Sequence, residues 1–337
     1  MTHSDNHHTP VRISVVGCGM WGRNIARNCA SLNVLENVSD SNKDRAEEFA
    51  RSFHCGVAEF EQICDDPQID GLMISASAAA HEQLAIYGLE KGKHIFIEKP
   101  MALSLAAANA INKAGKKAGR QIMIGHLIRY HPVFQELQRQ ISNGAIGSVR
   151  HIQANRLAMG RIRNTESALF DLCPHDISLI LALTGCLPET VSCHGAAHIT
   201  AGVVDMLATG MGFAGGITAG MNTSWLSPVK EHRLVVTGQT GSLVFDDTKS
   251  WSEKLTLYSD HITQSDSVFV VERASPLYLP VEEKEPLKQE VQAFIDVCRT
   301  GQPALTDGDE GVAVQSVLAA MIKDFTLTNQ GANLVQF

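Results

Sequence analysis

Residues 11–22, VRISVVGCGMWG, decide the fold. The run from Val11 to Val16 is apolar and rich in β-branched side chains, as in a buried parallel strand. Gly17 to Gly22 then has the pattern G-x-G-x-x-G, and an amphipathic helical pattern follows at once. In that setting the first glycine permits a tight turn, the second lets the backbone approach a pyrophosphate, and the third lets helix and strand pack closely. The motif therefore predicts a bound dinucleotide, with a tight turn that binds nothing as the alternative.

An acidic residue about 20 positions after the motif supports a dinucleotide site. A second apolar strand, predicted at 34–39, ends at Asp40. A carboxylate at this place binds a ribose 2′-hydroxyl and repels a 2′-phosphate, so NAD is favoured over NADP, although Lys43 lies nearby. Asp40 also suits the N-cap of the next helix, and the two roles are compatible.

Short apolar strands and amphipathic helices continue to alternate, which predicts a parallel sheet with helices on its faces. The strand at 95–97 delivers Glu98, Lys99 and Pro100. Pro100 keeps Lys99 out of the helical region, so an ionisable pair is held at the sheet edge where catalytic groups are expected. A solvated surface lysine is the alternative.

The residues expected to bind the cofactor are the glycine motif and side chains at the carboxyl ends of the strands. Small residues after the strand at 72–75 leave room for a ligand there. The predicted set is Gly17, Gly19, Met20, Trp21, Gly22, Asp40, Ser75, Ala76, His81, Glu98 and Lys99.

The pattern changes after residue 125, where strands begin to follow one another with tight turns at Gly215-Gly216 and Gly238–Gly241. This arrangement indicates a mostly antiparallel sheet in an α+β domain. An open sheet with one exposed face invites association, so we expect a homodimer or homotetramer. The expected segments are a flexible tail at 1–10, an NAD-binding Rossmann domain at 11–125, a substrate-binding and oligomerisation domain at 126–337, and helices within 286–337 that pack back toward the amino-terminal domain.

Length and composition limit the classes of function. A chain of 337 residues is too long for one ordinary core, so two domains are expected. The net charge of -8 argues against nucleic acid or an anionic membrane as a partner. The 8 cysteines are scattered without a C-x-x-C pair, as reduced thiols are. The amino terminus is polar and no segment approaches the ~20 apolar residues of a spanning helix, so a cytoplasmic location is expected.

Four features in order identify the chain as a member of the glucose–fructose oxidoreductase, inositol dehydrogenase and rhizopine catabolism (Gfo/Idh/MocA) family. They are the glycine motif, the tripeptide Glu98-Lys99-Pro100, the segment Arg129–Pro132 (RYHP), and Asp171-x-x-x-His175. The resemblance extends over nearly everything from Val11 to about Phe325. It implies an NAD(P)-dependent oxidoreductase acting on CH–OH groups, with a Rossmann domain and an α+β domain built on a large, mostly antiparallel open sheet. It also implies that Lys99, Asp171 and His175 are catalytic and that Glu98 approaches the nicotinamide ribose.

One position departs from the family pattern. The family often has an Asp three residues after the His, whereas here that place is Ser178 and Asp176 follows the His directly. The segments 170–176, 224–228 (SWLSP) and 245–247 (FDD) are similar to a subgroup of nucleotide-sugar dehydrogenases of surface-polysaccharide clusters. That subgroup includes enzymes that oxidise the 3-hydroxyl of UDP-N-acetylglucosamine.

Hydride transfer from a secondary alcohol needs a base for the hydroxyl proton and a positive group beside the developing alkoxide. His175 suits the first role, and Lys99 suits the second role or could share the proton with His175. Pro174 suggests that His175 lies in the first turn of a helix over 176–184, where the helix dipole would keep the imidazole neutral. Asp171 is expected to orient the ring or hold a substrate hydroxyl. The alternative is a helix-capping acid and a surface His, and we expect no metal because Asp171, His175 and Asp176 do not make a zinc site.

The expected substrate residues include basic side chains that could meet a diphosphate, since guanidinium groups match phosphate oxygens. A solvated basic patch is the alternative for these arginines, and packing in the domain junction is the alternative for Tyr130. The predicted set is His126, Arg129, Tyr130, Arg156, Arg161, Arg163, Asp171 and His175.

The leading hypothesis is an NAD-dependent dehydrogenase that oxidises the 3-hydroxyl of a UDP-activated amino sugar in surface-polysaccharide biosynthesis. A dehydrogenase of a free polyol or hexose is the alternative among enzymes. A non-catalytic NAD-sensing regulator is the alternative from another class, and it has no need of a base beside the nicotinamide.

Overall fold

The computed structural model describes residues 10–160, 162–163 and 166–328, which form two compact units. The first unit runs to Gly125 and takes up Leu287–Gly311, and the second contains His126–Pro286 and the chain from Val312 onward. Most of the predicted tail and Arg161 lie outside the described residues. None of the helices in the described ranges has the length and apolar character needed to cross a membrane.

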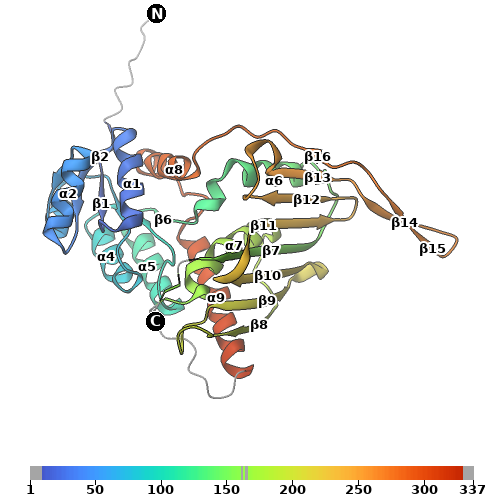
Figure 1. Ribbon diagram of the computed structural model, residues 1–337. Helices are drawn as coiled ribbons and strands as arrows, with labels where there is room; N and C mark the ends of the chain where they lie inside the picture. The colour runs from blue at the N-terminus through green and yellow to red at the C-terminus, as the bar shows by residue number, and fades with distance from the viewer. Residues whose placement is uncertain (1–9, 161, 164–165, 329–337) are drawn as a thin grey trace, which may run out of the picture. The chain divides into compact units, whose positions relative to one another are not determined.

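The first unit contains a six-stranded sheet whose strands are all parallel (Figure 1), which confirms the predicted Rossmann sheet. The strand order is β3-β2-β1-β4-β5-β6, so the chain reverses its direction of progress between β1 and β4. The strands are β1 (Ile13–Val16), β2 (Leu35–Ser39), β3 (Gly56–Val57), β4 (Gly71–Ile74), β5 (His94–Ile97) and β6 (Ile122–Ile124). In open parallel sheets such a reversal marks the crevice where ligands bind.

The helices of this unit begin and end where the sequence offers caps. The side chain of Asn42 accepts the backbone N–H of Arg45 at the start of α2, and Ser104 does the same for Ala107 at the start of α5. α5 ends at Gly119, whose φ of 63° favours glycine. The helices are α1 (Met20–Ser31), α2 (Lys43–Phe53), α3 (Phe60–Asp65), α4 (Ala78–Glu90), α5 (Leu105–Ala118) and α8 (Pro286–Thr300).

The second unit contains an eight-stranded sheet in the order β16-β13-β12-β11-β7-β10-β9-β8. Among the strand pairs of the described residues, only β7–β10 is parallel in this sheet, which confirms a mostly antiparallel sheet. The strands are β7 (Val149–Met159), β8 (Thr190–Ala196), β9 (Met206–Gly212), β10 (Thr218–Ser224), β11 (Leu226–Gly238), β12 (Ser242–Asp246), β13 (Leu255–Tyr258) and β16 (Leu277–Tyr278). The helices of this unit are α6 (Pro132–Ser142), α7 (Ala168–Thr184) and α9 (Gly308–Thr328).

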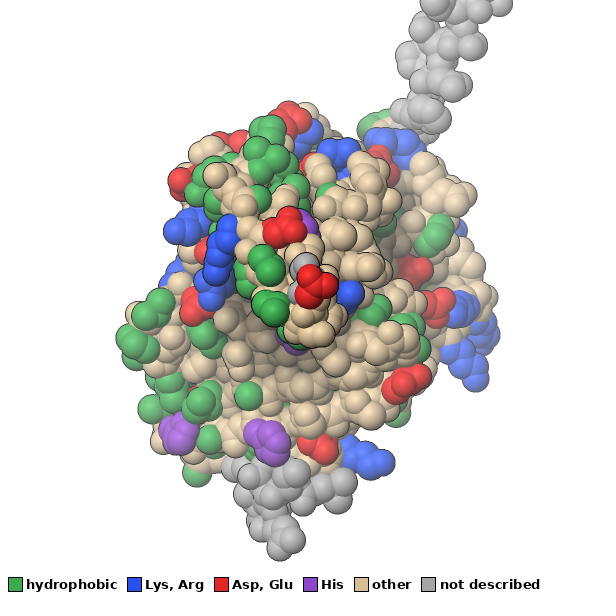
Figure 2. Space-filling view, turned by 90° about the vertical axis from the view of Figure 1, so that its right-hand side faces the viewer, with side chains coloured by type: hydrophobic (Ala, Val, Ile, Leu, Met, Phe, Trp, Pro, Cys, Tyr) green, Lys and Arg blue, Asp and Glu red, His purple; other side chains and the backbone are tan. Residues whose placement is uncertain are grey.

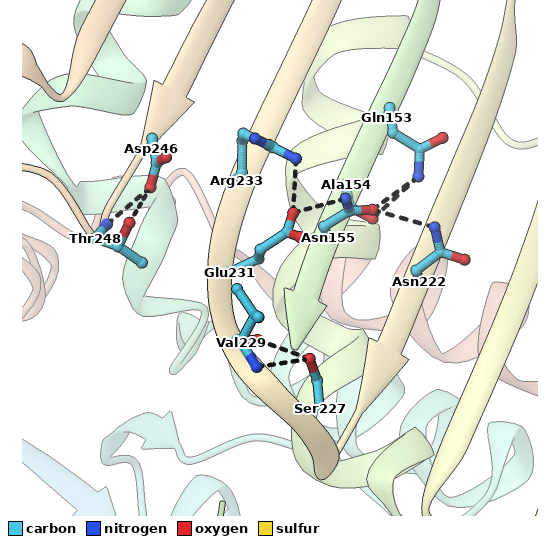
Figure 3. A network of polar contacts seen from close by, with 10 residues as sticks. All are labelled: Gln153, Ala154, Asn155, Asn222, Ser227, Val229, Glu231, Arg233, Asp246 and Thr248. Carbon is cyan, nitrogen blue, oxygen red and sulfur yellow. Dashed lines mark hydrogen bonds and ion pairs between the residues drawn. The ribbon is translucent and has the colours of Figure 1, made fainter. Parts of the chain in front are cut away.

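One face of this sheet packs on a hydrophobic core to which α6, α7 and α9 contribute. Side chains alternate along β7: Ile152 and Ala154 are buried, whereas Gln153 and Asn155 point to the other face. That open face carries a polar network, because Asn155 contacts Gln153, Asn222 and Glu231 across three neighbouring strands (Figure 3). The open face of the predicted sheet is therefore polar rather than apolar.

A two-stranded hairpin, β14 (His261–Ser265) and β15 (Val268–Glu272), extends away from the eight-stranded sheet (Figure 1). Figure 2 looks at the molecule from this side and shows hydrophobic side chains at the surface among acidic and basic ones. Ile262 is 67% exposed and Phe269 is 71% exposed. Such a hairpin receives little support from its own core.

Two element boundaries and the packing of one helix differ from the sequence prediction. α7 begins at Ala168 and not near residue 176, because Ser167 is its N-cap and Pro174 is accommodated inside the helix. α4 begins at Ala78 and not at His81. Both carboxyl-terminal helices are predicted to pack toward the amino-terminal domain, but only α8 belongs to the first unit. From Val312 onward α9 belongs to the second unit, because its apolar stripe lies in the core of that unit.

Candidate active site

The glycine motif forms a cradle that only glycine can build at two of its three positions. Gly17 has a φ of 99°, and a Cβ there would lie 2.7 Å from the backbone of Ser75 and Ala76. A Cβ on Gly22 would lie 2.0 Å from the carbonyl oxygen of Gly17. By contrast, a Cβ on Gly19 would meet nothing within 4 Å. Open space therefore lies beside Gly19, where a pyrophosphate can approach the backbone only if no side chain is present.

The amino terminus of α1 fits an anionic group at the same place. Gly19 is the N-cap of this helix and gives it no side-chain cap, and no acidic side chain lies in its first turn. The first N–H groups and the positive end of the helix dipole are therefore available to phosphate oxygens. The residues present fit a dinucleotide, which supplies the hydride acceptor when bound.

Asp40 follows β2 and holds the glycine loop. Its Oδ2 accepts the backbone N–H of Cys18 at 2.7 Å, and its Oδ1 accepts that of Asn42 at 2.8 Å. The guanidinium of Arg45 lies 3.6 Å from the same carboxylate. Asp40 thus directly follows β2 and anchors the glycine loop, a role that the sequence did not reveal. Its predicted role as the N-cap is wrong, because Asn42 caps α2.

Ser75 and His81 tie the loops at the sheet edge together. Ser75 Oγ donates to the carbonyl of Gly17 at 2.7 Å, which joins the loop after β4 to the glycine motif. His81 is 1% exposed, and its ring nitrogens lie 2.9 Å from the carbonyl of Pro100 and 3.1 Å from that of Ala76. Burial lowers the pKa of His81, so the ring is neutral and donates to one carbonyl at a time. This places His81 as a brace for the loops, beneath the surface that a cofactor would touch.

Glu98 ends β5 and is held by the glycine motif. The indole Nε1 of Trp21 donates to its Oε1, and the backbone N–H of Lys99 donates to its Oε2 at 3.2 Å. Burial raises the pKa of Glu98 to about 7, against the lowering effects of the Lys99 charge and of these two hydrogen bonds. Lys99 itself is half-buried and precedes a cis peptide bond to Pro100. Trp21, Glu98 and Lys99 are therefore brought together at one edge of the sheet.

The second unit places Asp171 and His175 on α7. The two residues are four positions apart, so they lie on the same side of the helix, and both are half-buried. Asp171 lies in the first turn, but His175 lies two turns inside a helix that begins at Ala168. The predicted placement of His175 in the first turn is therefore wrong. The helix dipole then gives no reason for the imidazole to be neutral, because its effect is confined to the first turn.

The carboxylate of Asp171 is fixed on both sides. Arg163 Nη2 donates to its Oδ1 at 2.9 Å, and the indole Nε1 of Trp225 donates to its Oδ2 at 3.2 Å. Trp225 is 3% exposed, and Arg163 also pairs with Glu166 at 2.7 Å. Two charge-assisted hydrogen bonds hold the carboxylate in one orientation, as a group that aligns a ring or a hydroxyl requires.

Arg156 on β7 is held by an ion pair with α7. It is 9% exposed, and its Nε and Nη2 donate to Asp176 at 3.0 and 2.6 Å. This bidentate pair explains why Asp176 follows the His directly: the carboxylate anchors α7 to β7. The structure thus gives Arg156 a partner within the protein in place of the predicted diphosphate.

The remaining predicted substrate residues lie in the second unit. His126, Arg129 and Tyr130 are buried, at 1%, 9% and 3% exposure, and Arg129 Nη1 lies 3.4 Å from the carbonyl of Ser178. Arg161 falls outside the described residues. The adjacent His131 stacks on Trp251 at a centroid distance of 5.3 Å and lies 3.5 Å from Asp247, so the RYHP and FDD segments form one cluster.

Two residues that interact with predicted site residues were not in the predicted set. The hydrogen bond from Trp225 to Asp171 joins segments 54 positions apart, and only the quoted SWLSP segment pointed to it. Glu290 lies on the apolar stripe of α8, between Leu287 and Phe294, and is 0% exposed. A charged residue on an apolar stripe was the signal that could have revealed it.

A Rossmann unit with a glycine cradle, followed by an open-sheet unit carrying an acid and a histidine on one helix, defines an NAD(P)-dependent oxidoreductase. The model of the "Oxidoreductase family, NAD-binding Rossmann fold" matches residues 11–126, and that of the "GFO/IDH/MocA C-terminal domain" matches residues 134–244. The chain belongs to the Gfo/Idh/MocA family of oxidoreductases.

Alignments with named relatives cover nearly the whole chain. The UDP-N-acetylglucosamine 3-dehydrogenase of Acidithiobacillus ferrooxidans is 27% identical, with 93% of this chain and 96% of the relative covered. The scyllo-inositol 2-dehydrogenase (NAD(+)) of Bacillus subtilis is also 27% identical, covering 92% and 93%. The solved structure of the Acidithiobacillus enzyme superposes with a TM-score of 0.81 at 25% identity, covering 95% of this chain and 98% of that one.

Proposed function

We propose that this oxidoreductase transfers a hydride between a secondary hydroxyl of a sugar and NAD, and that its substrate is a UDP-activated amino sugar oxidised at the 3-hydroxyl. The observation that carries the reaction is the fixed carboxylate of Asp171 one turn before His175 on α7. The similarity to a UDP-N-acetylglucosamine 3-dehydrogenase supports the substrate class. Surface-polysaccharide biosynthesis is the setting that this class of substrate implies.

In the proposed mechanism, His175 accepts the hydroxyl proton of the sugar, and Lys99 stabilises the alkoxide that develops on the same oxygen. Asp171 aligns either the imidazole or a neighbouring substrate hydroxyl. Because both of its oxygens already accept hydrogen bonds from Arg163 and Trp225, its task is orientation and not proton transfer. NAD takes the hydride when bound, so the protein's work is alignment.

A substrate screen tests the substrate class. We expect NADH to form with UDP-N-acetylglucosamine and related UDP-sugars, and much more slowly with free hexoses or inositols. The alternative, a free polyol dehydrogenase, is favoured by the similarity to inositol dehydrogenases. Turnover of inositol or glucose without turnover of any UDP-sugar would replace the proposal by that alternative.

Two variants test the site and the regulator hypothesis together. Lys99→Ala and His175→Ala are each expected to lower kcat/KM by about 100-fold or more, since a positioned base contributes that much. Lys113→Ala, an exposed lysine on α5, is the matched control and should keep wild-type turnover. Wild-type protein that binds NAD and oxidises nothing in the screen would favour the non-catalytic sensor.

A further inference from the structure

Two glutamates are buried in the first unit, and only one of them is satisfied. Glu98 is 7% exposed and accepts hydrogen bonds from Trp21 and Lys99. Glu290 on α8 is 0% exposed, and neither of its carboxyl oxygens has a hydrogen-bond partner among the described residues. An ionised carboxylate in that position would be very costly, so Glu290 is held as the neutral acid.

Packing of α8 on β5 places Glu98 and Glu290 at the same height along the strand. The rings of Phe294 and Phe96 meet edge to face at a centroid distance of 5.9 Å. Glu290 lies one helical turn before Phe294, and Glu98 lies two strand residues after Phe96, on the same side of the strand. Cys298, one turn after Phe294, lies against Gly71, which pairs with His94 at the start of β5, so α8 runs opposite to β5. One turn of helix rises about 5.4 Å and two strand residues rise about 6.6 Å, so this orientation places the two acids side by side.

The charges of the two acids are linked. Burial raises the pKa of Glu98 to about 7, and the nearby Lys99 charge lowers it in part. Burial and the charge of Glu98 together raise the pKa of Glu290 well above its ordinary value. Near neutrality two adjacent buried acids carry at most one negative charge, and it lies on Glu98, because Glu98 has two hydrogen-bond donors and Glu290 has none among the described residues.

We propose that the buried pair of Glu98 and Glu290 is a proton-linked reader of the cofactor's redox state, in which ionised Glu98 favours NAD+ over NADH. The inference rests on the proposed function only in requiring that NAD binds at the glycine cradle. Glu290 is a positioning residue: as a neutral acid behind Glu98, it keeps the single charge of the pair on the cofactor side.

The position of Glu98 supports this reading. Asp40, at the end of β2, marks the adenosine side of the crevice, so the nicotinamide side extends across the switch point toward β4 and β5. Glu98 ends β5 and is bonded to Trp21 of the glycine motif, which places it in that crevice. The nicotinamide ring is positively charged in NAD+ and neutral in NADH, so an anion there attracts only the oxidised form.

Calorimetry of cofactor binding tests the proposal without a substrate. NAD+ binding to wild-type protein at about pH 7 should release a fraction of a proton, seen as a dependence of the binding heat on the ionisation enthalpy of the buffer. NADH binding should show no such dependence. The ratio of the Kd for NADH to the Kd for NAD+ should rise about tenfold between about pH 6 and about pH 8. A ratio that stays constant over this range would overturn the proposal while leaving the proposed function intact.

Two isosteric variants assign the charge. Glu98→Gln should make the ratio independent of pH, and Glu290→Gln should keep the wild-type pH dependence, because it replaces one neutral group by another. The reverse pattern, with the dependence kept in Glu98→Gln and lost in Glu290→Gln, would overturn the assignment. Failure of wild-type protein to bind either cofactor would overturn the proposed function and this inference with it.

Discussion

Trp225 holds one oxygen of Asp171 while Arg163 holds the other. Trp225→Phe keeps the buried ring and removes only the N–H donor, so the carboxylate loses a hydrogen bond of about 1.5–3 kcal/mol. We expect kcat/KM to fall by roughly tenfold or more, mainly through kcat, with the Kd for NAD unchanged. Steady-state kinetics and NAD titration measure the two quantities.

Trp251→Phe is the matched control for this substitution, since the Trp251 ring stacks on His131. It should leave kcat within about twofold of wild type. If Trp225→Phe behaved like Trp251→Phe while Asp171→Asn was inactive, the indole would have no part in aligning Asp171.

The three motif glycines differ in what a methyl group would meet. Gly22→Ala brings a Cβ within 2.0 Å of a carbonyl, so we expect a loss of stability of several degrees in Tm. Gly19→Ala meets nothing within 4 Å, so its Tm should equal that of wild type. Its Cβ would however stand where the pyrophosphate approaches, and the Kd for NAD should rise at least tenfold. Unchanged NAD affinity in Gly19→Ala would argue against binding at this cradle.

Among the elements, α8 carries a pH dependence of stability. The folded-state pKa of Glu290 lies well above its ordinary value of 4.5, so the folded protein keeps a proton that the unfolded chain gives up as pH rises. Stability is therefore lost with increasing pH, and Glu290→Gln removes that loss. The Tm of Glu290→Gln minus that of wild type should grow more positive from about pH 5 to about pH 8. Glu283→Gln, at an exposed position before α8, should show no such trend.

α7 is anchored by the buried pair of Arg156 and Asp176. Arg156→Met leaves an uncompensated buried carboxylate, so we expect a loss of about 3–5 kcal/mol in unfolding free energy. The double variant Arg156→Met, Asp176→Leu removes both charges and should recover most of that loss. Urea unfolding followed by circular dichroism measures both. A double variant no more stable than the single one would mean that the pair is held by more than its mutual charge.

The elements also show how far the sequence could predict the site. Local signals sufficed for the glycine cradle, the position of Asp40 and the strand that delivers Glu98 and Lys99. Local signals failed for α7, because Pro174 suggests a helix start, whereas the N-cap is Ser167 and Pro174 lies inside the helix. The pairing of Arg156 with Asp176 and of Trp225 with Asp171 depends on which strands become neighbours, and no local pattern encodes that.

For the whole molecule, we predict association through the open face of the eight-stranded sheet. This face carries small and polar side chains, including Ala208 and the network around Asn155 shown in Figure 3. Ala208→Arg and Asn222→Arg place a charged side chain on this face and should lower the oligomer mass to that of a monomer. Sedimentation velocity measures the mass, and Glu90→Arg on α4 is the control. An unchanged mass in both sheet variants would place the interface elsewhere.

The chain leaves the first unit after Gly125 and returns to it only at Leu287. Phe294, which packs against Phe96 and would lie within 3.0 Å of a Cβ on Gly71, therefore leaves the ribosome 170 residues after Ile124, the end of the sheet (294 − 124). During synthesis, the apolar surface of the parallel sheet that α8 covers stays exposed until residues 126–286 have been made. We therefore expect a truncated product that ends before α8 to aggregate and not to fold as a free NAD-binding domain.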